Sequence, residues 1–154
     1  MITKIVNKYQ TPAGDDPGLT LISDERNSQR STTGASRTPL FEQGRFVLHS
    51  GTATNWLINC DVLSKESLDT LARIITDKVG PFGECVGIPR GGLRIASALQ
   101  NYVTSGPRLL VDDVLTSGAS MEEMRCEGDK GAVIFARGPC PGWIVPVFST
   151  VVAV

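Results

Sequence analysis

Hydrophobic positions recur with two different spacings between residues 41 and 154, and they predict strands that alternate with helices. Short apolar runs predict buried strands, and apolar residues at a spacing of 3.6 predict helices with one buried face. The predicted strands are 56–60, 85–88, 108–112 and 132–136. The predicted helices are 64–80, 93–102 and 118–126. Such an alternation indicates an α/β fold, in which helices cover both faces of a parallel sheet.

Residues 1–40 have a different composition. Between Ser23 and Thr38 the only apolar side chain is Ala35. A segment this polar cannot bury enough surface to offset the entropy lost on ordering. We therefore expect an extended or partly disordered N-terminal arm at 1–40 and a folded domain at 41–154. The arm is either a plain tail or a segment that folds over a partner subunit or a site, and the composition leaves both interpretations open.

Composition and charge narrow the class of protein. The 154 residues predict about one domain, and a net charge of −1 argues against nucleic-acid binding through a broad basic face. No apolar run reaches the roughly 18 residues that a membrane helix needs, and the first residues lack the apolar core of a signal peptide. We expect a soluble, cytoplasmic protein without membrane or nucleic-acid partners. Its four cysteines form no Cys-x-x-Cys motif, and Cys60 and Cys85 lie in apolar runs that predict buried thiols.

Two loops follow predicted strands and carry candidate chemistry. The first consists of Asp112, Asp113, Val114, Leu115, Thr116, Ser117, Gly118, Ala119 and Ser120. Its small residues and the helix after it suit a phosphate, while its paired carboxylates suit a diol or a hydrated magnesium ion. Ser120 and Glu123 also have the spacing of a helix capping box, which predicts an ordinary helix cap but does not explain the carboxylates.

The second loop follows the predicted strand 85–88 and consists of Pro89, Arg90, Gly91 and Gly92. The glycines permit unusual backbone angles, and Arg90 is a fixed cation for an anion. Taken alone, this sequence is also compatible with a simple turn. Ligands of open α/β sheets bind at the carboxyl ends of the strands, so the two loops together predict one ligand with two phosphate groups and a diol between them.

These motifs resemble those of a known family. "LLVDDVLTSGAS" resembles the phosphoribosyl pyrophosphate (PRPP) signature of type I phosphoribosyltransferases, and "VGIPRGG" resembles their pyrophosphate loop. "GRFVLHSGTATNWLINCD" is similar to the amino-terminal part of orotate phosphoribosyltransferase. The resemblance covers residues 44–137. It implies a type I phosphoribosyltransferase fold and an Mg²⁺-dependent transfer of the phosphoribosyl group from PRPP to a base such as orotate.

The resemblance also implies a role for each matching residue. Asp112 and Asp113 would bind the ribose hydroxyls and contact Mg²⁺ indirectly, through PRPP and water. The loop 116–120 (Thr116, Ser117, Gly118, Ala119, Ser120) would hold the 5′-phosphate. The loop 89–92 (Pro89, Arg90, Gly91, Gly92) would hold the pyrophosphate, and Arg90 with the two aspartates would form the catalytic set. Trp56 would stack on the base or else pack in the core. Members of the family are commonly dimers, which implies a homodimer here.

The chain also departs from the family pattern. His49 stands where orotate enzymes commonly carry a lysine that contacts PRPP, and it is alternatively a surface or hinge residue. Only 103–107 separates the helix 93–102 from the next strand, where orotate enzymes have a long hood with a catalytic lysine. Closure would then come from the arm or from a partner subunit, or the protein would bind ligand and catalyse poorly. We therefore also consider a non-catalytic PRPP-binding or nucleotide-binding regulatory module, and an enzyme for a purine base.

Near the carboxyl end, Trp143 precedes an apolar run that contains Pro146. Proline cannot donate a ladder hydrogen bond, so this run is predicted to lie at the edge of a sheet. Trp143 is predicted to pack against the core, with contact to the base as the alternative.

Overall fold

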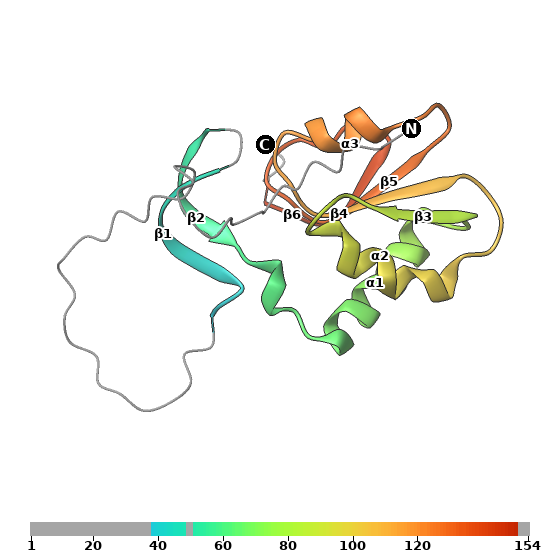
Figure 1. Ribbon diagram of the computed structural model, residues 1–154, viewed down its shortest axis with the longest axis horizontal. Helices are drawn as coiled ribbons and strands as arrows, with labels where there is room; N and C mark the ends of the chain where they lie inside the picture. Colours follow the sequence, from blue (N-terminus) through green and yellow to red (C-terminus); the bar gives the residue numbers. More distant parts are fainter. Residues whose placement is uncertain (1–37, 49–50, 151–154) are drawn as a thin grey trace, which may run out of the picture. The chain divides into compact units, whose positions relative to one another are not determined.

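The computed structural model describes residues 38–48 and 51–150 (Figure 1). The predicted arm therefore lies almost entirely outside the described residues, and so does His49. The boundary that we predicted at residue 40 stays a prediction. The described residues fall into two compact units that meet in the sequence between Val62 and Leu63.

The unit that ends at Val62 is a two-stranded antiparallel ribbon. Strand β1 (Phe41–Val47) pairs with β2 (Ala53–Ile58), and a short 3-10 helix η1 (Cys60–Val62) follows. The predicted strand 56–60 therefore begins earlier and ends at Ile58. Past Ile58, the Asn59 N–H still donates to the Leu40 carbonyl at 2.7 Å and its side-chain amide donates to Glu42 at 3.0 Å, and the chain then turns into η1 at Cys60.

The second unit contains the parallel sheet. Its elements are α1 (Lys65–Val79), β3 (Glu84–Gly87), α2 (Gly92–Leu99), η2 (Gln100–Tyr102), β4 (Arg108–Leu115), α3 (Ala119–Met124), β5 (Lys130–Ala136) and β6 (Ile144–Ser149). The strand order is β3-β4-β5-β6, and each neighbouring pair is parallel. Figure 1 shows α1 and α2 on one side of these strands and α3 on the other. The predicted α/β fold with a parallel sheet flanked by helices is confirmed.

Helix α1 illustrates how local sequence sets an element. The Ser64 side chain accepts a hydrogen bond from the Ser67 N–H at 3.2 Å, which satisfies one of the donors left open at a helix start. Gly80 ends the helix with φ 69°, a conformation that glycine adopts without steric cost. The buried face, predicted from the 3.6-residue spacing, consists of Leu68, Leu71, Ala72 and Ile75.

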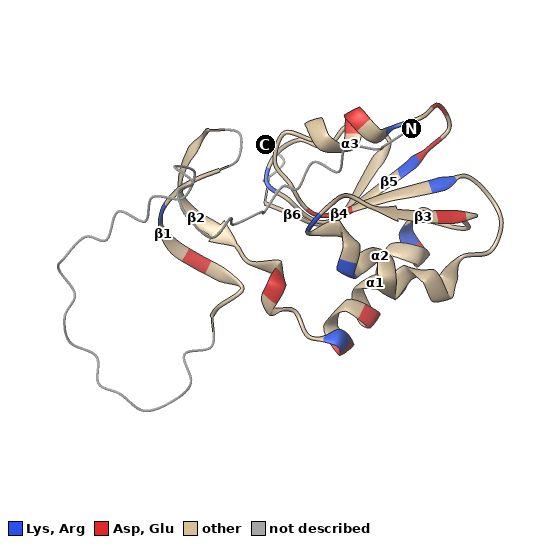
Figure 2. Ribbon diagram, viewed as in Figure 1, with Lys and Arg blue, Asp and Glu red and all other residues tan. Residues whose placement is uncertain are grey.

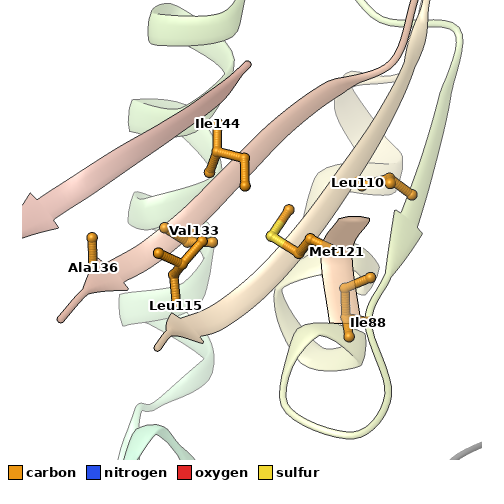
Figure 3. Packing of buried hydrophobic residues seen from close by; sticks show 7 residues of the cluster. All are labelled: Ile88, Leu110, Leu115, Met121, Val133, Ala136 and Ile144. Carbon is orange, nitrogen blue, oxygen red and sulfur yellow. The ribbon is translucent and has the colours of Figure 1, made fainter. Parts of the chain in front are cut away.

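The core between the sheet and α3 joins side chains that are far apart in the sequence. Figure 3 shows seven of them together: Ile88, Leu110, Leu115, Met121, Val133, Ala136 and Ile144. Trp143 packs against this cluster, as predicted. Cys60 and Cys85 are buried free thiols, which is also confirmed. Strand β6, which contains Pro146, forms one edge of the sheet as the proline predicted.

Three predicted elements have different lengths in the structure. Strand β4 continues past Asp112 to Leu115, because Val114 and Leu115 pair with Phe135 and Ala136 of the long strand β5. The helix predicted at 93–102 is α-helical only to Leu99 and continues as the 3-10 helix η2. The helix predicted at 118–126 is shorter, Ala119–Met124, because Arg125 turns to an extended backbone with ψ 136°.

Charged residues of both signs are interspersed along the described elements (Figure 2). A bidentate ion pair joins Arg108, at the start of β4, to Asp129, just before β5, and the Arg108 Nε–Asp129 Oδ1 distance is 3.2 Å. Within 38–48 and 51–150, no helix is long and apolar enough to cross a membrane.

Candidate functional site

The fold brings the two candidate loops to one edge of the sheet. Strand β3 ends at Gly87 and its parallel neighbour β4 ends at Leu115. The loop 89–92 follows β3 and the loop 116–120 follows β4, so both lie at the carboxyl ends of adjacent strands. Ligands of open α/β sheets bind at this place.

The loop 89–92 lies directly against β4. The Ile88 N–H donates to the Val111 carbonyl at 2.8 Å, and the Gly92 N–H donates to Ile88 at 2.9 Å. A Cβ atom on Gly92 would overlap the Val111 carbonyl, and one on Gly91 would overlap the Asp113 carboxyl group. Both glycines are therefore required by the close approach of the loop to β4. This contact joins the two motifs that the sequence analysis singled out.

The predicted strand ended at Asp112, but β4 continues to Leu115, so both carboxylates lie inside the strand. Both are buried, Asp112 at 2% exposure and Asp113 at 7%. Side chains of successive strand residues point to opposite faces of a sheet. Asp113 faces Gly91 and the α2 side, so Asp112 faces the α3 side.

Each carboxylate also accepts a hydrogen bond from the backbone of β4. The Asp113 N–H donates to Asp112 Oδ1 at 2.9 Å, and the Val114 N–H donates to Asp113 Oδ1 at 2.7 Å. The pairing of β3 with β4 ends at Val111, so this part of β4 has a paired neighbour only on the β5 side. One oxygen of each carboxylate is therefore committed to the backbone, and Asp113 is the one placed beside the loop 89–92.

The loop 116–120 turns from β4 into α3 through Gly118. This residue has φ 77°, in the left-handed region that favours glycine, and its carbonyl accepts the N–H groups of Met121 and Glu122 at 3.1 and 3.0 Å. The predicted capping box of Ser120 and Glu123 is wrong. Ser120 is the second residue of α3, and the position before the helix is occupied by Gly118 without a side-chain cap. The Ser117 hydroxyl accepts the Ala119 N–H at 3.4 Å instead.

Arg137 is a cation at this edge that was not predicted from the sequence. Arg137 directly follows β5, and its N–H donates to the Leu115 carbonyl at 2.9 Å, which places its backbone beside the end of β4. Its side chain is half-buried, and burial lowers the pKa of the guanidinium. The sequence did contain a signal for this residue, because Arg137 comes directly after the predicted strand 132–136. Arg90, in the loop 89–92, is exposed.

The roles predicted for Trp56 and His49 are not decided by this geometry. Trp56 lies in β2 of the other unit, where it is half-buried and its cross-strand partner is Gln43. Its base-binding role stays a prediction. His49 lies outside the described residues, so its tentative role stays a prediction as well.

The residues at this edge fit the indirect magnesium binding that the family implies. Among the described residues there is no group of three or more His, Cys, Asp or Glu side chains that could hold a metal ion. Asp112 and Asp113 each already accept a backbone N–H with one oxygen, which at Asp113 leaves the other oxygen for a ligand or water. Magnesium sites commonly combine one or two carboxylates with water and substrate phosphates. Asp113, beside the loop 89–92, has the suitable position.

The short connection 103–107 lies at the opposite end of the strands. The Thr104 N–H donates to the Phe82 carbonyl at 2.9 Å, and the Gly83 N–H donates to Pro107 at 3.0 Å. Both contacts precede the first residues of β3 and β4, so this connection contributes no cover at the carboxyl ends. Orotate enzymes have a long hood in place of this connection, and residues 103–107 do not replace it.

Comparison with solved structures agrees with this architecture. Orotate phosphoribosyltransferase from Aeropyrum pernix superposes with a TM-score of 0.60 at 21% identity, over 71% of this chain and 88% of that one. UMP synthase from Leishmania donovani superposes with a TM-score of 0.57 at 18% identity, over 72% of this chain. This chain spans about a third of the length of the Leishmania protein, 34%. No protein-family model and no curated protein sequence matches the chain. The described chain thus has the type I phosphoribosyltransferase fold that its two loop motifs predicted.

Proposed function

We propose that this protein is an Mg²⁺-dependent phosphoribosyltransferase that transfers the phosphoribosyl group of PRPP to a nitrogenous base, orotate or another pyrimidine-like base. The observation that carries the proposal is the contact between Gly91 and Asp113. It joins a glycine loop that suits pyrophosphate to a carboxylate that suits a ribose hydroxyl. The fold shared with an orotate phosphoribosyltransferase and a UMP synthase supports the same assignment.

The proposed reaction is a substitution at C1′ of the ribose. The bond from C1′ to the pyrophosphate oxygen breaks, and a bond from C1′ to a ring nitrogen of the base forms. The bonding pair leaves with pyrophosphate, and the base nitrogen loses its proton to solvent if it carried one. Catalysis of this kind depends mainly on positioning and on stabilising charge as it develops.

Different residues would bind the 5′-phosphate, the pyrophosphate and the ribose of PRPP. Backbone N–H groups of the loop 116–120 and the hydroxyls of Thr116, Ser117 and Ser120 would hold the 5′-phosphate. The loop 89–92 would hold the pyrophosphate, with Arg90 facing the charge that develops on it. Asp112 and Asp113 would accept the ribose hydroxyls, with Asp113 lying beside the loop 89–92. Magnesium, when bound, would neutralise part of the pyrophosphate charge.

The decisive assay measures pyrophosphate release from PRPP with Mg²⁺ across a panel of pyrimidine and purine bases. We expect release with orotate or a related pyrimidine, and none after chelation of magnesium. In the variant carrying Asp112→Asn and Asp113→Asn we expect weaker PRPP binding. Unchanged PRPP affinity in this variant would refute the assigned site. If pyrophosphate is released only with purine bases, the substrate is a purine and not the proposed pyrimidine.

A second candidate function is a non-catalytic module that binds PRPP or a nucleotide and regulates another process. The position of the connection 103–107 favours it, because this segment does not exclude water from the carboxyl ends of the strands. PRPP binding without pyrophosphate release for any base would establish this alternative. The phosphoribosyltransferase proposal includes a homodimer, because a partner subunit could cover the carboxyl ends of the strands. Sedimentation of the intact chain tests whether it forms a dimer.

A further inference from the structure

Helix α3 carries the end of the loop 116–120, yet it has little apolar attachment to the sheet. It is six residues long, and Met121 is its only buried residue. Its N-cap residue, Gly118, has no side chain to cap it. The helix is joined to the loop by a long bond from the Ala119 N–H to the Ser117 hydroxyl at 3.4 Å and by the bonds from Met121 and Glu122 to the Gly118 carbonyl. Such a short helix is marginal by itself, since helical stability in proteins comes mostly from tertiary packing.

Trp143 supplies a second attachment from a different part of the chain. Its indole N–H donates to Glu122 Oε1 at 2.6 Å, and the Arg125 guanidinium carbon lies 4.6 Å from the centre of its ring. Arg125 and Glu122 also face each other at 3.6 Å. The ring of Trp143 therefore contacts both a residue of α3 and the residue that ends it.

Trp143 is itself fixed on β5. Its carbonyl accepts the Gly131 N–H at 2.9 Å, and a Cβ atom on Gly131 would lie 2.7 Å from the ring atom Cζ3. Only glycine leaves room for the indole at this place. The residue just before β6 is thus held against β5 and reaches back to α3.

We propose that Trp143, Glu122 and Arg125 form a clasp that positions the loop 116–120 for the 5′-phosphate. The three are positioning residues, since none of them belongs to either loop. The inference rests on the proposed function. It adds that 5′-phosphate binding depends on a contact from the β5–β6 connection, whereas pyrophosphate binding at the loop 89–92 does not.

The test compares two probes on the intact chain, ribose 5-phosphate and inorganic pyrophosphate with Mg²⁺. Trp143→Phe keeps a ring on Gly131 but removes the indole donor. We expect it to weaken ribose 5-phosphate binding about three- to ten-fold, in line with the net contribution of a typical hydrogen bond. Pyrophosphate affinity is expected to stay unchanged. A general loss of stability would weaken both probes, so equal losses, or none, would overturn the proposal.

Glu122→Ala and Glu122→Gln sharpen the result. The glutamine variant keeps an oxygen that accepts the indole N–H, so we expect it to retain ribose 5-phosphate binding that the alanine variant loses. Asp69→Asn, which alters the exposed Lys65–Asp69 pair on α1, is the matched control and should change neither affinity. Equal affinity in the two Glu122 variants would contradict the clasp.

A second measurement separates this inference from the proposed function. Amide hydrogen exchange at Met121 and Glu122 reports the two bonds to Gly118 without any ligand. Trp143→Phe should accelerate exchange there relative to the amides of β5, and unchanged exchange would refute the clasp. If wild-type protein binds neither PRPP nor ribose 5-phosphate, the proposed function fails, while the exchange result still decides whether Trp143 orders α3.

Discussion

Replacing Gly91 by alanine tests whether the contact between the loop 89–92 and Asp113 is as close as the structure has it. The backbone angles at Gly91 are φ −58° and ψ −40°, which any residue adopts readily. From backbone entropy alone, alanine should stabilise the protein by about 0.4–1 kcal/mol. The new Cβ would, however, lie well inside the 3.0 Å that real Cβ atoms keep from their neighbours, at the Asp113 carboxyl group.

The steric term should outweigh the entropic one. Overpacking a buried contact costs typically about 1–3 kcal/mol. The Asp113 carboxylate cannot turn away freely, because its Oδ1 accepts the Val114 N–H at 2.7 Å and the residue is 7% exposed. We therefore expect Gly91→Ala to lower the free energy of unfolding by about 1–2 kcal/mol, measured by urea unfolding. At roughly 2–4 °C per kcal/mol for a chain of this size, the melting temperature falls by roughly 2–8 °C.

A double-mutant cycle isolates the contact. In an Asp113→Ala background the obstructing carboxylate is gone, so Gly91→Ala should become neutral or stabilising. Gly92→Ala is the matched control, because its Cβ would meet the Val111 backbone carbonyl, which Asp113→Ala leaves in place. If Gly91→Ala stabilises the wild-type protein, or destabilises both backgrounds equally, the steric reasoning is refuted.

Three further predictions concern other described residues. Burial raises the pKa of the Cys85 thiol from 9.0 to about 12, so a thiol reagent at pH 8 should label exposed Cys126 and leave Cys85 unreacted until the chain unfolds. As the pH rises above 9, the Cys85 thiol loses its proton in the unfolded chain but keeps it in the folded protein up to about pH 12. The contribution of Cys85 to the free energy of unfolding should therefore decline between pH 9 and about 12, and Cys85→Ala should flatten that decline. The hydrogen bond from Arg108 lowers the pKa of Asp129, so its stabilisation is present above pH 3.8 and is lost as the pH falls below it. Melting curves of wild type and Asp129→Asn should therefore converge in acid. Lys130→Met removes the Nζ bonds to the Val79 and Pro81 carbonyls at 2.6 and 3.1 Å, and should lower the free energy of unfolding by about 1 kcal/mol in urea titrations; no change would show that water replaces them.

Several parts of this protein were predictable because they depend on neighbours in the chain. The cap at Ser64 and the stop at Gly80 are local signals, and both ends of α1 agree with them. The buried strands stand out as short apolar runs. Strand β1 was not predicted, because Gly44 and Arg45 interrupt its apolar pattern and its pairing with β2 is what stabilises it.

The candidate site also has parts that the sequence predicts and parts that depend on pairing between distant segments. The two loop motifs and their place after neighbouring strands followed from the sequence and from the rule for open α/β sheets. The prediction that β4 ends at Asp112 was wrong, since its length is set by pairing with β5. The capping box at Ser120 failed because Gly118, in a left-handed conformation, moves the helix start to Ala119.

The sequence by itself determined the fold class, the glycine loop and the acidic strand. Each of these features depends on residues that are adjacent in the chain or one helical turn apart. Only the tertiary structure decided that both aspartates lie inside β4, that Gly91 lies against Asp113, and that Trp143 reaches α3. These relations join residues about 20 positions apart or depend on how far a strand is paired. They follow from strand register and close packing, which no local pattern specifies.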